Sequence, residues 1–165
     1  MTIHTTHPFA DPDPDPVRRL RGRLTGTVAL LTSERAGLTV SSLMIANGEP
    51  ARVLALVDPD SDLAAAVQRT GRAVVQLLSW SHRDLAEAFA GTAPAPGGPF
   101  RTGEFVETAW GPRLADAMTW AAGSLEDAAE VGWSTLLTLR VEEVVVGEDD
   151  QPLVHRRGRY VRPAG

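Results

Sequence analysis

The sequence predicts a mainly β fold, an antiparallel barrel with short helices at its ends. Short apolar segments, rich in β-branched residues, recur along the chain and are separated by turns. These segments do not alternate regularly with helices, so the pattern of a parallel sheet with crossover helices is missing. The 165 residues are enough for one domain with a sizeable core.

The expected strands are apolar runs of β-forming residues bounded by turn residues. Ser134–Val146 gives the longest strand signal, with Leu137, Leu139 and Val141 on one face. Glu34–Gly37 reads as a hairpin turn. The predicted strands are Gly26–Thr32, Thr39–Leu43, Arg52–Val57, Ala73–Leu78, Glu104–Glu107, Ser134–Val146, Leu153–His155 and Arg159–Val161.

Helices are predicted where capping residues flank an amphipathic pattern. Ser61 is a good N-cap for a helix over Asp62–Thr70, and Gly71 suits its C-terminal end. A second helix opens near Ser81 with a capping-box pattern, and Leu85, Ala86 and Phe89 form its apolar face. Shorter helical stretches are expected over Val17–Leu24 and Leu114–Trp120, and a Gly- and Pro-rich loop is expected over 91–103.

Residues 1–16 do not have the composition of a folded segment. The alternating run Asp11-Pro12-Asp13-Pro14-Asp15-Pro16 cannot continue a helix and carries like charges. We expect a flexible arm whose Asp/Pro run is locally stiff and extended, with a disordered lead-in as the alternative. The folded domain is then 17–165.

Composition excludes several classes of function. The net charge of −5 disfavours nucleic acid as a partner, because phosphate binding needs a basic face. The absence of cysteine excludes a thiolate nucleophile and a zinc–cysteine site. No apolar run approaches ~20 residues, and the first residues lack an apolar signal core, so we expect a cytoplasmic protein without a membrane partner.

A row of hydroxyls follows the first apolar strand and is the most informative motif. Thr39-Val40-Ser41-Ser42 is followed after four residues by Asn47-Gly48-Glu49-Pro50. Hydroxyls at the end of a strand suit a flat polar ring with a phosphate tail, because they donate to ring and phosphate oxygens. An exposed row of β-strand hydroxyls with no ligand is the alternative.

Two more blocks follow in the chain. The segment 75–89 (VQLLSWSHRDLAEAF) places Ser79 and Ser81 before a helix, whose free N–H groups favour an anion. An ordinary N-cap without a ligand is the alternative there. The segment 151–160 (QPLVHRRGRY) closes the chain, and His155 in it reads as a strand histidine at a rim or as a ligand contact.

Together the three blocks resemble the flavin reductase family, whose fold is an FMN-binding split β-barrel. The resemblance covers about Pro16 to Val161. It implies FMN or FAD as cofactor or substrate, NADH or NADPH as reductant, a homodimer, and a flavin-dependent monooxygenase as a possible partner. The residues that it assigns to flavin binding are Thr39, Val40, Ser41, Ser42, Asn47, Ser79, Ser81 and His82.

The chain departs from the family pattern at several positions. His82 stands where the family usually has Gln, and Asn47 replaces a Ser. Val131-Gly132-Trp133-Ser134 stands where many relatives have Gly-Asp-His, whose His is associated with nicotinamide binding. Trp133 therefore makes the hydride step the point at which this chain differs most from its relatives.

The sequence thus predicts an NAD(P)H-dependent flavin reductase in which flavin performs the redox chemistry, so we name no catalytic residue and no metal ligand. One alternative is a non-enzymatic flavin carrier or sensor on the same fold. Another is a barrel that has lost flavin and serves as an interaction protein. The basic run Arg18–Arg23 reads as a solvated face, with steering of anionic flavin as its alternative.

Overall fold

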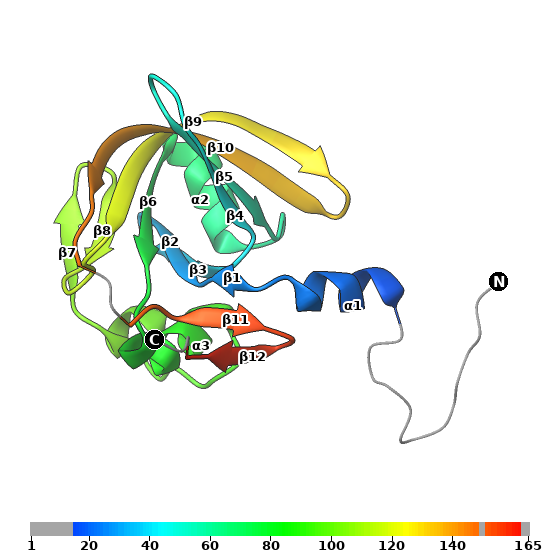
Figure 1. The fold of residues 1–165 in the computed structure, drawn as a ribbon. Coiled ribbons are helices and arrows are strands. Elements are labelled where there is room, and N and C mark those ends of the chain that lie inside the picture. The colour runs from blue at the N-terminus through cyan, green and yellow to red at the C-terminus, as the bar shows by residue number, and fades with distance from the viewer. Residues whose placement is uncertain (1–14, 149–150, 163–165) are drawn as a thin grey trace, which may run out of the picture.

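The computed structural model describes residues 15–148 and 151–162, and it is built around one curled antiparallel sheet (Figure 1). The seven strands of this sheet lie in the order β3-β2-β6-β9-β10-β5-β4. Their bounds are β2 Ala29–Ser33, β3 Ala36–Val40, β4 Leu43–Ala46, β5 Arg52–Val57, β6 Arg72–Leu77, β9 Trp120–Val131 and β10 Ser134–Val145.

Two small sheets complete the β structure of the described residues. The first has the order β1-β11-β12 and lies at one end of the barrel beside α3 (Figure 1). The second is the separate hairpin β7–β8. Their bounds are β1 Gly26–Thr27, β11 Val154–Arg156, β12 Arg159–Val161, β7 Phe105–Thr108 and β8 Gly111–Leu114. The predicted class, a mainly β split antiparallel barrel with short helices, is confirmed.

Three short α-helices and two 3-10 turns accompany the strands in the described part of the chain. The helix α2 spans Asp62–Thr70, as predicted. The Ser61 hydroxyl accepts a hydrogen bond from the Ala64 amide at 3.1 Å, and Gly71 ends the helix at a φ of 72°. The other bounds are α1 Pro16–Arg23, η1 Trp80–His82, α3 Arg83–Ala90 and η2 Pro99–Thr102.

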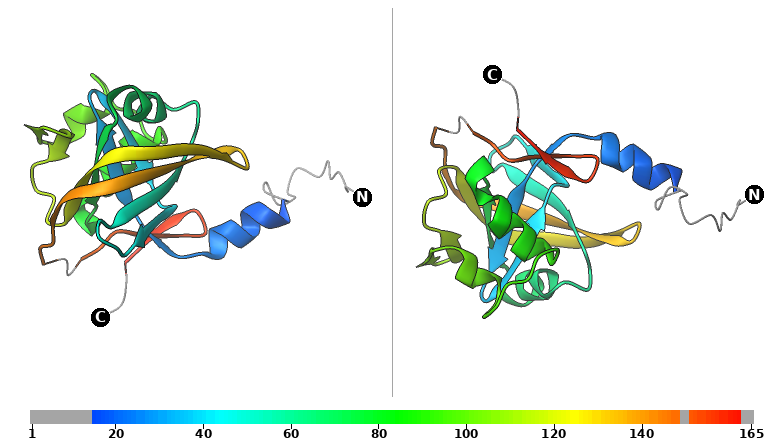
Figure 2. Two further views of the ribbon diagram at one scale, coloured as in Figure 1. Left: turned by 90° about the horizontal axis from the view of Figure 1, so that it is seen from above. Right: turned by 90° about the horizontal axis from the view of Figure 1, so that it is seen from below.

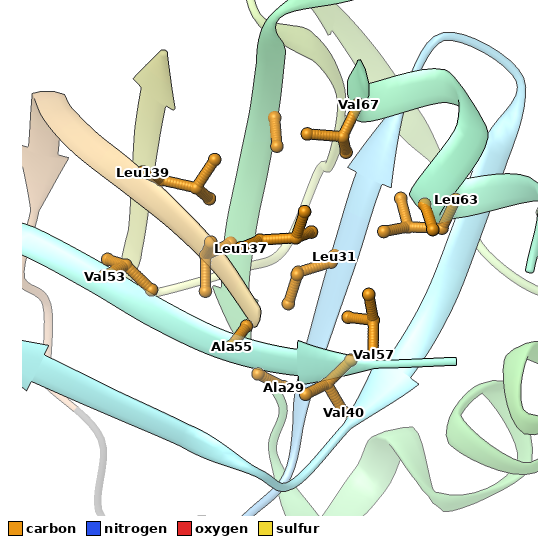
Figure 3. Packing of buried hydrophobic residues seen from close by; sticks show 13 residues of the cluster. Ala29, Leu31, Val40, Val53, Ala55, Val57, Leu63, Val67, Leu137 and Leu139 are labelled. Atoms are coloured by element: carbon orange, nitrogen blue, oxygen red, sulfur yellow. The ribbon is translucent and has the colours of Figure 1, made fainter. Parts of the chain in front are cut away.

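The main core lies inside the curl of the sheet (Figure 3). Leu31 from β2, Val53 from β5 and Leu137 from β10 meet there, all almost completely buried. Leu63 and Val67 on one face of α2 close it from one side. Burying such side chains contributes roughly 1.5–3 kcal/mol each, so this core holds the barrel strands in place.

A second core lies between the barrel, α3 and the C-terminal hairpin. Phe89 on α3 packs edge-on against Phe100 and Phe105, with ring centroids 4.9 Å and 6.0 Å away. Leu153, which precedes β11, is fully buried in the same core. This packing fixes α3 and β11–β12 against the barrel, and those are the elements that form the site.

A buried glutamine links the barrel to β7–β8. Gln76 on β6 donates from Nε2 to the Leu30 carbonyl at 2.9 Å and accepts at Oε1 from the Leu114 amide at 2.7 Å. The Thr32 hydroxyl donates to the Pro112 carbonyl on β8. These side chains, together with Arg72 of β6, which donates to the Ala109 carbonyl at 2.9 Å, make polar contacts with a hairpin that is not part of the large sheet.

Some predicted elements differ from the structure. The segment Thr39–Leu43 is not one strand, because β3 ends at Val40 and β4 begins at Leu43. The helical stretch predicted over Leu114–Trp120 is wrong, since β8 ends and β9 begins there. The strand Trp120–Val131 was not predicted, because its Ala-, Gly- and acid-rich sequence has few β-forming residues and no regular alternation.

The helix α1 and the β9–β10 hairpin extend from the barrel on the same side in both Figure 1 and Figure 2. Residues 1–14 of the predicted arm lie outside the described residues. Asp15 is the N-cap of α1 and Pro16 its first residue, so the helix begins one residue before the predicted domain boundary. No helix in the described ranges is long and apolar enough to cross a membrane.

Candidate functional site

A surface cleft of about 660 Å³ lies where β3, α3 and the β11–β12 hairpin meet. Its lining combines hydroxyl, aromatic and charged side chains. These residues include Thr39, Ser41, Trp80, Arg83, Glu87, His155, Arg159 and Tyr160. A cleft with aromatic walls and a few polar groups is the usual form of a small-molecule site.

Two of the predicted hydroxyl residues line this cleft, Thr39 and Ser41. They lie two positions apart, so both point to the same side of the strand and its extension. The Thr39 hydroxyl donates to the Ala86 carbonyl of α3 at 2.6 Å, which leaves its oxygen free to act as an acceptor. The Ser41 hydroxyl forms no hydrogen bond with another described residue, so its proton can be donated to a ligand.

The neighbouring predicted residues lie elsewhere. Val40 points to the other side of β3 and is buried in the main core, so only its backbone can reach a ligand. The Ser42 hydroxyl accepts from the Arg21 guanidinium at 3.4 Å, and Asn47 is exposed in the turn between β4 and β5. Ser42 and Asn47 are not among the residues that line the cleft.

His82 has a structural environment that the sequence did not indicate. The Ser79 amide donates to its Nδ1 at 2.9 Å, and its Nε2 lies 3.1 Å from the Asp116 carboxylate. Because Nδ1 accepts a hydrogen bond, the ring proton lies on Nε2, from which it is donated to the Asp116 carboxylate. The capping box predicted to start at Ser81 is not formed: Ser79 and His82 form the capping box here, and Ser81 is exposed.

Beside His82, two side chains that the motif did not assign reach the cleft, Trp80 and Arg83. The Arg83 guanidinium lies 4.2 Å from the centre of the Trp80 ring, and its Nε donates to the Trp80 carbonyl at 2.9 Å. A second guanidinium, from Arg162, lies 5.4 Å from the same ring. These contacts hold Trp80 and Arg83 in defined positions.

The C-terminal hairpin contributes an aromatic pair to the cleft. The rings of His155 and Tyr160 meet edge-on with centroids 5.9 Å apart. Burial lowers the pKa of His155, and the charge of Arg21 lowers it further. Burial also raises the pKa of Tyr160, with an added contribution from Glu87. Both shifts favour the neutral form, so these side chains present uncharged polar rings to the cleft.

A second hollow of about 690 Å³ lies at Glu34, Asp62 and Arg69 and contains none of the predicted site residues. Arg69 there forms a 2.6 Å ion pair with Glu34, so its charge is already balanced. Within the described residues, no group of three acidic, His or Cys side chains could hold a metal ion. We therefore take the cleft at β3, α3 and β11–β12 as the candidate site.

Trp133 is not part of this cleft. It lies in the turn between β9 and β10, and 94% of its surface is exposed. Ser134 follows as the first residue of β10. Within one chain, an indole in this position does not line the site and so does not cover a ligand there.

The family model for the flavin reductase like domain matches residues 21–164. The chain belongs to this family. It is 25% identical over 151 residues to the reductase component of 4-hydroxyphenylacetate 3-monooxygenase from Pseudomonas aeruginosa, covering 88% of this chain and 89% of that one. It is 28% identical over 155 residues to the FMN reductase (NADH) RutF 2 of Methylorubrum extorquens, covering 88% and 86%.

The fold is shared with solved flavin reductases. The NADH:FAD oxidoreductase SgcE6 of Streptomyces globisporus, solved in complex with NAD and FAD fragments, superposes with a TM-score of 0.81 at 22% identity, covering 90% of this chain and 91% of that one. At this identity the likeness establishes the architecture. The flavin contacts of the predicted residues stay a prediction.

Proposed function

We propose that the protein is an NAD(P)H-dependent flavin reductase that binds FMN or FAD in the cleft between β3, α3 and β11–β12. The observation that carries this proposal is the placement of Thr39 and Ser41, chosen from the sequence alone, in a cleft with an aromatic and cationic lining. The names of the relatives, which include an NADH-dependent FMN reductase, support the same activity.

In this proposal Ser41 donates to the flavin, Thr39 accepts, and Trp80 and Tyr160 supply flat apolar surface. The flavin, when bound, accepts hydride from the nicotinamide, while the protein orients the ring and excludes water from part of it. Neutral His155 and Tyr160 keep this end of the cleft polar without adding charge. The other predicted residues contact the flavin only through their backbone or support the cleft indirectly. They are Ser42, Asn47, Ser79, Ser81 and His82.

The test is anaerobic reduction of the protein loaded with FMN or FAD. Mixing with NADH or NADPH should bleach the visible absorbance of oxidised flavin, and the faster nucleotide identifies the natural reductant. Binding of flavin without bleaching by either nucleotide would favour the carrier or sensor. That second function has one observation in its favour, the Trp133-Ser134 pair where many relatives have Asp-His.

A homodimer is part of the proposal. Large apolar side chains are exposed on the edge strand β4 and on β9–β10, where Met44 is 65%, Ile45 61% and Val144 60% exposed. An exposed apolar edge strand normally requires a cover, because it otherwise promotes aggregation. A second copy of the chain provides such a cover, and the exposed Trp133 would pack against that copy.

We also infer that reduced flavin is passed to a monooxygenase. The support is the Pseudomonas aeruginosa relative, which is named as a monooxygenase reductase component. The cytoplasmic location expected from the sequence belongs to the same proposal. Coupled turnover with a flavin-dependent oxygenase, measured as product formed per NADH consumed, tests this step.

A further inference from the structure

The cleft contains two arginines that the sequence motif did not identify, Arg83 and Arg159. Arg83 is the first residue of α3, and Arg159 is the first residue of β12. More than seventy residues separate them in the chain, and only the packing of the C-terminal hairpin beside α3 brings both to one cleft (Figure 1).

Neither arginine has a carboxylate partner in the described part of the chain. Other arginines do: Arg52 pairs with Glu126 at 2.8 Å. Glu87 lines the same cleft one helical turn after Arg83, yet the two form no ion pair. The cleft therefore presents two guanidinium groups that form no ion pair and one carboxylate, so its lining carries an excess of positive charge, although the protein as a whole carries a net charge of −5.

Arg83 is also held in place before any ligand arrives. Its Nε is bonded to the Trp80 carbonyl, and its planar group stacks on the Trp80 ring at 4.2 Å. The two terminal nitrogens remain available as donors. A fixed guanidinium loses little side-chain freedom on binding, and its fork of donors matches the oxygens of a phosphate.

His82 cannot serve this role, because both of its ring nitrogens are bonded within the protein. Ser79 and Ser81 do not line the cleft. The phosphate that the sequence motif assigns to this helix start therefore needs other donors, and Arg83 is the next residue along.

We propose that Arg83 and Arg159 bind the phosphate of the flavin nucleotide, with Trp80 as the platform that positions Arg83. The inference rests on the proposed flavin site and assigns its anion-binding residues. It predicts a ligand with at least one phosphate, such as FMN or the diphosphate of FAD, over riboflavin.

The experiment measures Kd by flavin fluorescence for riboflavin, FMN and FAD with the wild type, Arg83→Ala and Arg159→Ala. Each substitution should weaken FMN binding by about tenfold to a hundredfold, because each removes charge-assisted hydrogen bonds. Riboflavin binding should change by less than about twofold, within the range of a lost weak contact. Arg156→Ala is the matched control, since Arg156 lies on the same hairpin, is exposed and does not line the cleft.

Two further measurements separate the outcomes. The Kd for FMN should rise with ionic strength in the wild type and rise less in Arg83→Ala, because salt screens a charge contact. Trp80→Leu should lower the affinity for FMN by a larger factor than the affinity for riboflavin if Trp80 positions Arg83, because a loss of flat surface alone would affect both flavins equally. If FAD binds far better than FMN and both arginines affect only FAD, the diphosphate is the group bound.

Equal wild-type affinity for riboflavin and FMN would overturn the inference while leaving the flavin site intact. Equal losses for riboflavin and FMN in Arg83→Ala would also overturn it, because the arginine would then act on the ring or on the fold. No binding of any flavin by the wild type would refute the proposed function itself. Thermal unfolding of each variant checks that the fold is unchanged.

Discussion

Individual side chains in the cleft differ in what they can still offer to a ligand. The Thr39 hydroxyl already donates to the Ala86 carbonyl, whereas the Ser41 hydroxyl lines the cleft and forms no hydrogen bond with another described residue. A hydroxyl that is committed to the protein contributes to the shape of the site. A hydroxyl that is uncommitted can exchange water for ligand.

Ser41→Ala should therefore weaken flavin binding by about threefold to tenfold, the equivalent of one neutral hydrogen bond. The free energy of unfolding should stay unchanged within about 0.5 kcal/mol, as is usual for a surface substitution. Ser42→Ala is the control, because Ser42 does not line the cleft. Equal effects of the two substitutions in a fluorescence titration would argue against the assignment of Ser41.

His82 should matter for stability rather than for direct contact with the ligand. His82→Ala leaves the Ser79 amide without its acceptor in a partly buried position, which typically costs about 1–3 kcal/mol. His82→Gln restores an acceptor within reach and should recover part of this loss. Urea unfolding of both variants measures the difference, and Ser81→Ala serves as an exposed neighbour. A stable His82→Ala protein that no longer binds flavin would show that the ring contacts the ligand after all.

At the scale of the elements, α3 depends on a close approach to β3. A Cβ added at Gly37 would lie 2.6 Å from the Phe89 ring, closer than such atoms approach each other in proteins. Phe89 is held between Phe100 and Phe105 and cannot easily move aside. The missing side chain of Gly37 therefore lets α3 lie against the strand that carries Thr39.

Gly37→Ala should destabilise the protein by about 1–3 kcal/mol, the usual cost of overpacking. It should also weaken flavin binding, because the added methyl group would push α3, and Arg83 with it, away from β3. Phe89→Leu removes the contacting ring atoms, so it should cost less in the Gly37→Ala background than on its own. Additive costs in a double-mutant cycle would show that the two residues do not compete for the same space.

The β11–β12 hairpin should make stability depend on pH through His155. Its pKa is lowered in the folded protein, so the unfolded chain binds the proton more readily. The contribution of neutral His155 to the free energy of unfolding is fully present above the unfolded pKa of about 6.5. It declines as the pH falls toward the lower pKa of the folded protein. His155→Gln should flatten this part of the curve of unfolding free energy against pH. An identical curve in both proteins would mean that another group titrates there.

The sequence was most informative where local chemistry decides the structure. The helix Asp62–Thr70 was predicted with its bounds because Ser61 and Gly71 fix both ends, and Arg52–Val57 because its apolar run is unambiguous. The strand Trp120–Val131 was missed because packing decides it: a Cβ at Gly123 would lie 2.6 Å from the Arg140 carbonyl oxygen of the neighbouring strand. The close approach of β10 requires a glycine at position 123, and no local sequence pattern indicates that requirement.

The site divides in the same way. Thr39 and Ser41, which line the cleft, could be named from the sequence because a motif places them on one short segment; their contact with flavin stays a prediction. Arg83 and Arg159 were missed because each, taken alone, reads as a solvated arginine, and only the tertiary fold brings them to one cleft. His82 was assigned to the ligand because a sequence does not show that Asp116 and the Ser79 amide hold both ring nitrogens.

For the whole molecule, the exposed apolar side chains on β4 and β9–β10 predict association. Ile45→Glu should shift the proposed dimer toward monomer in analytical ultracentrifugation, because it places a charge on an apolar edge strand. Val106→Glu, on the separate β7–β8 hairpin, is a control at another exposed apolar residue, 44% exposed against 61% for Ile45, and should leave the mass unchanged. A monomeric wild type at micromolar concentration would contradict the homodimer.

Trp133 allows a kinetic test of the same assembly. If the exposed indole limits access of the nicotinamide to a neighbouring copy's flavin, Trp133→His should speed reduction by NADH in stopped-flow measurements. Trp133→Ser is the control for loss of bulk alone. Rapid reduction of the wild type with no gain in Trp133→His would show that this position does not limit the reaction.

The Gln76 side chain has a consequence for hydrogen exchange. Its Oε1 holds the Leu114 amide as a neighbouring strand would, although β8 has no ladder with the large sheet. That amide should exchange with deuterium as slowly as those of the central strands, while the other β7–β8 amides exchange early. In Gln76→Leu the Leu114 amide should exchange with the rest of its hairpin. A single protected amide would then report when β7–β8 separates from the barrel.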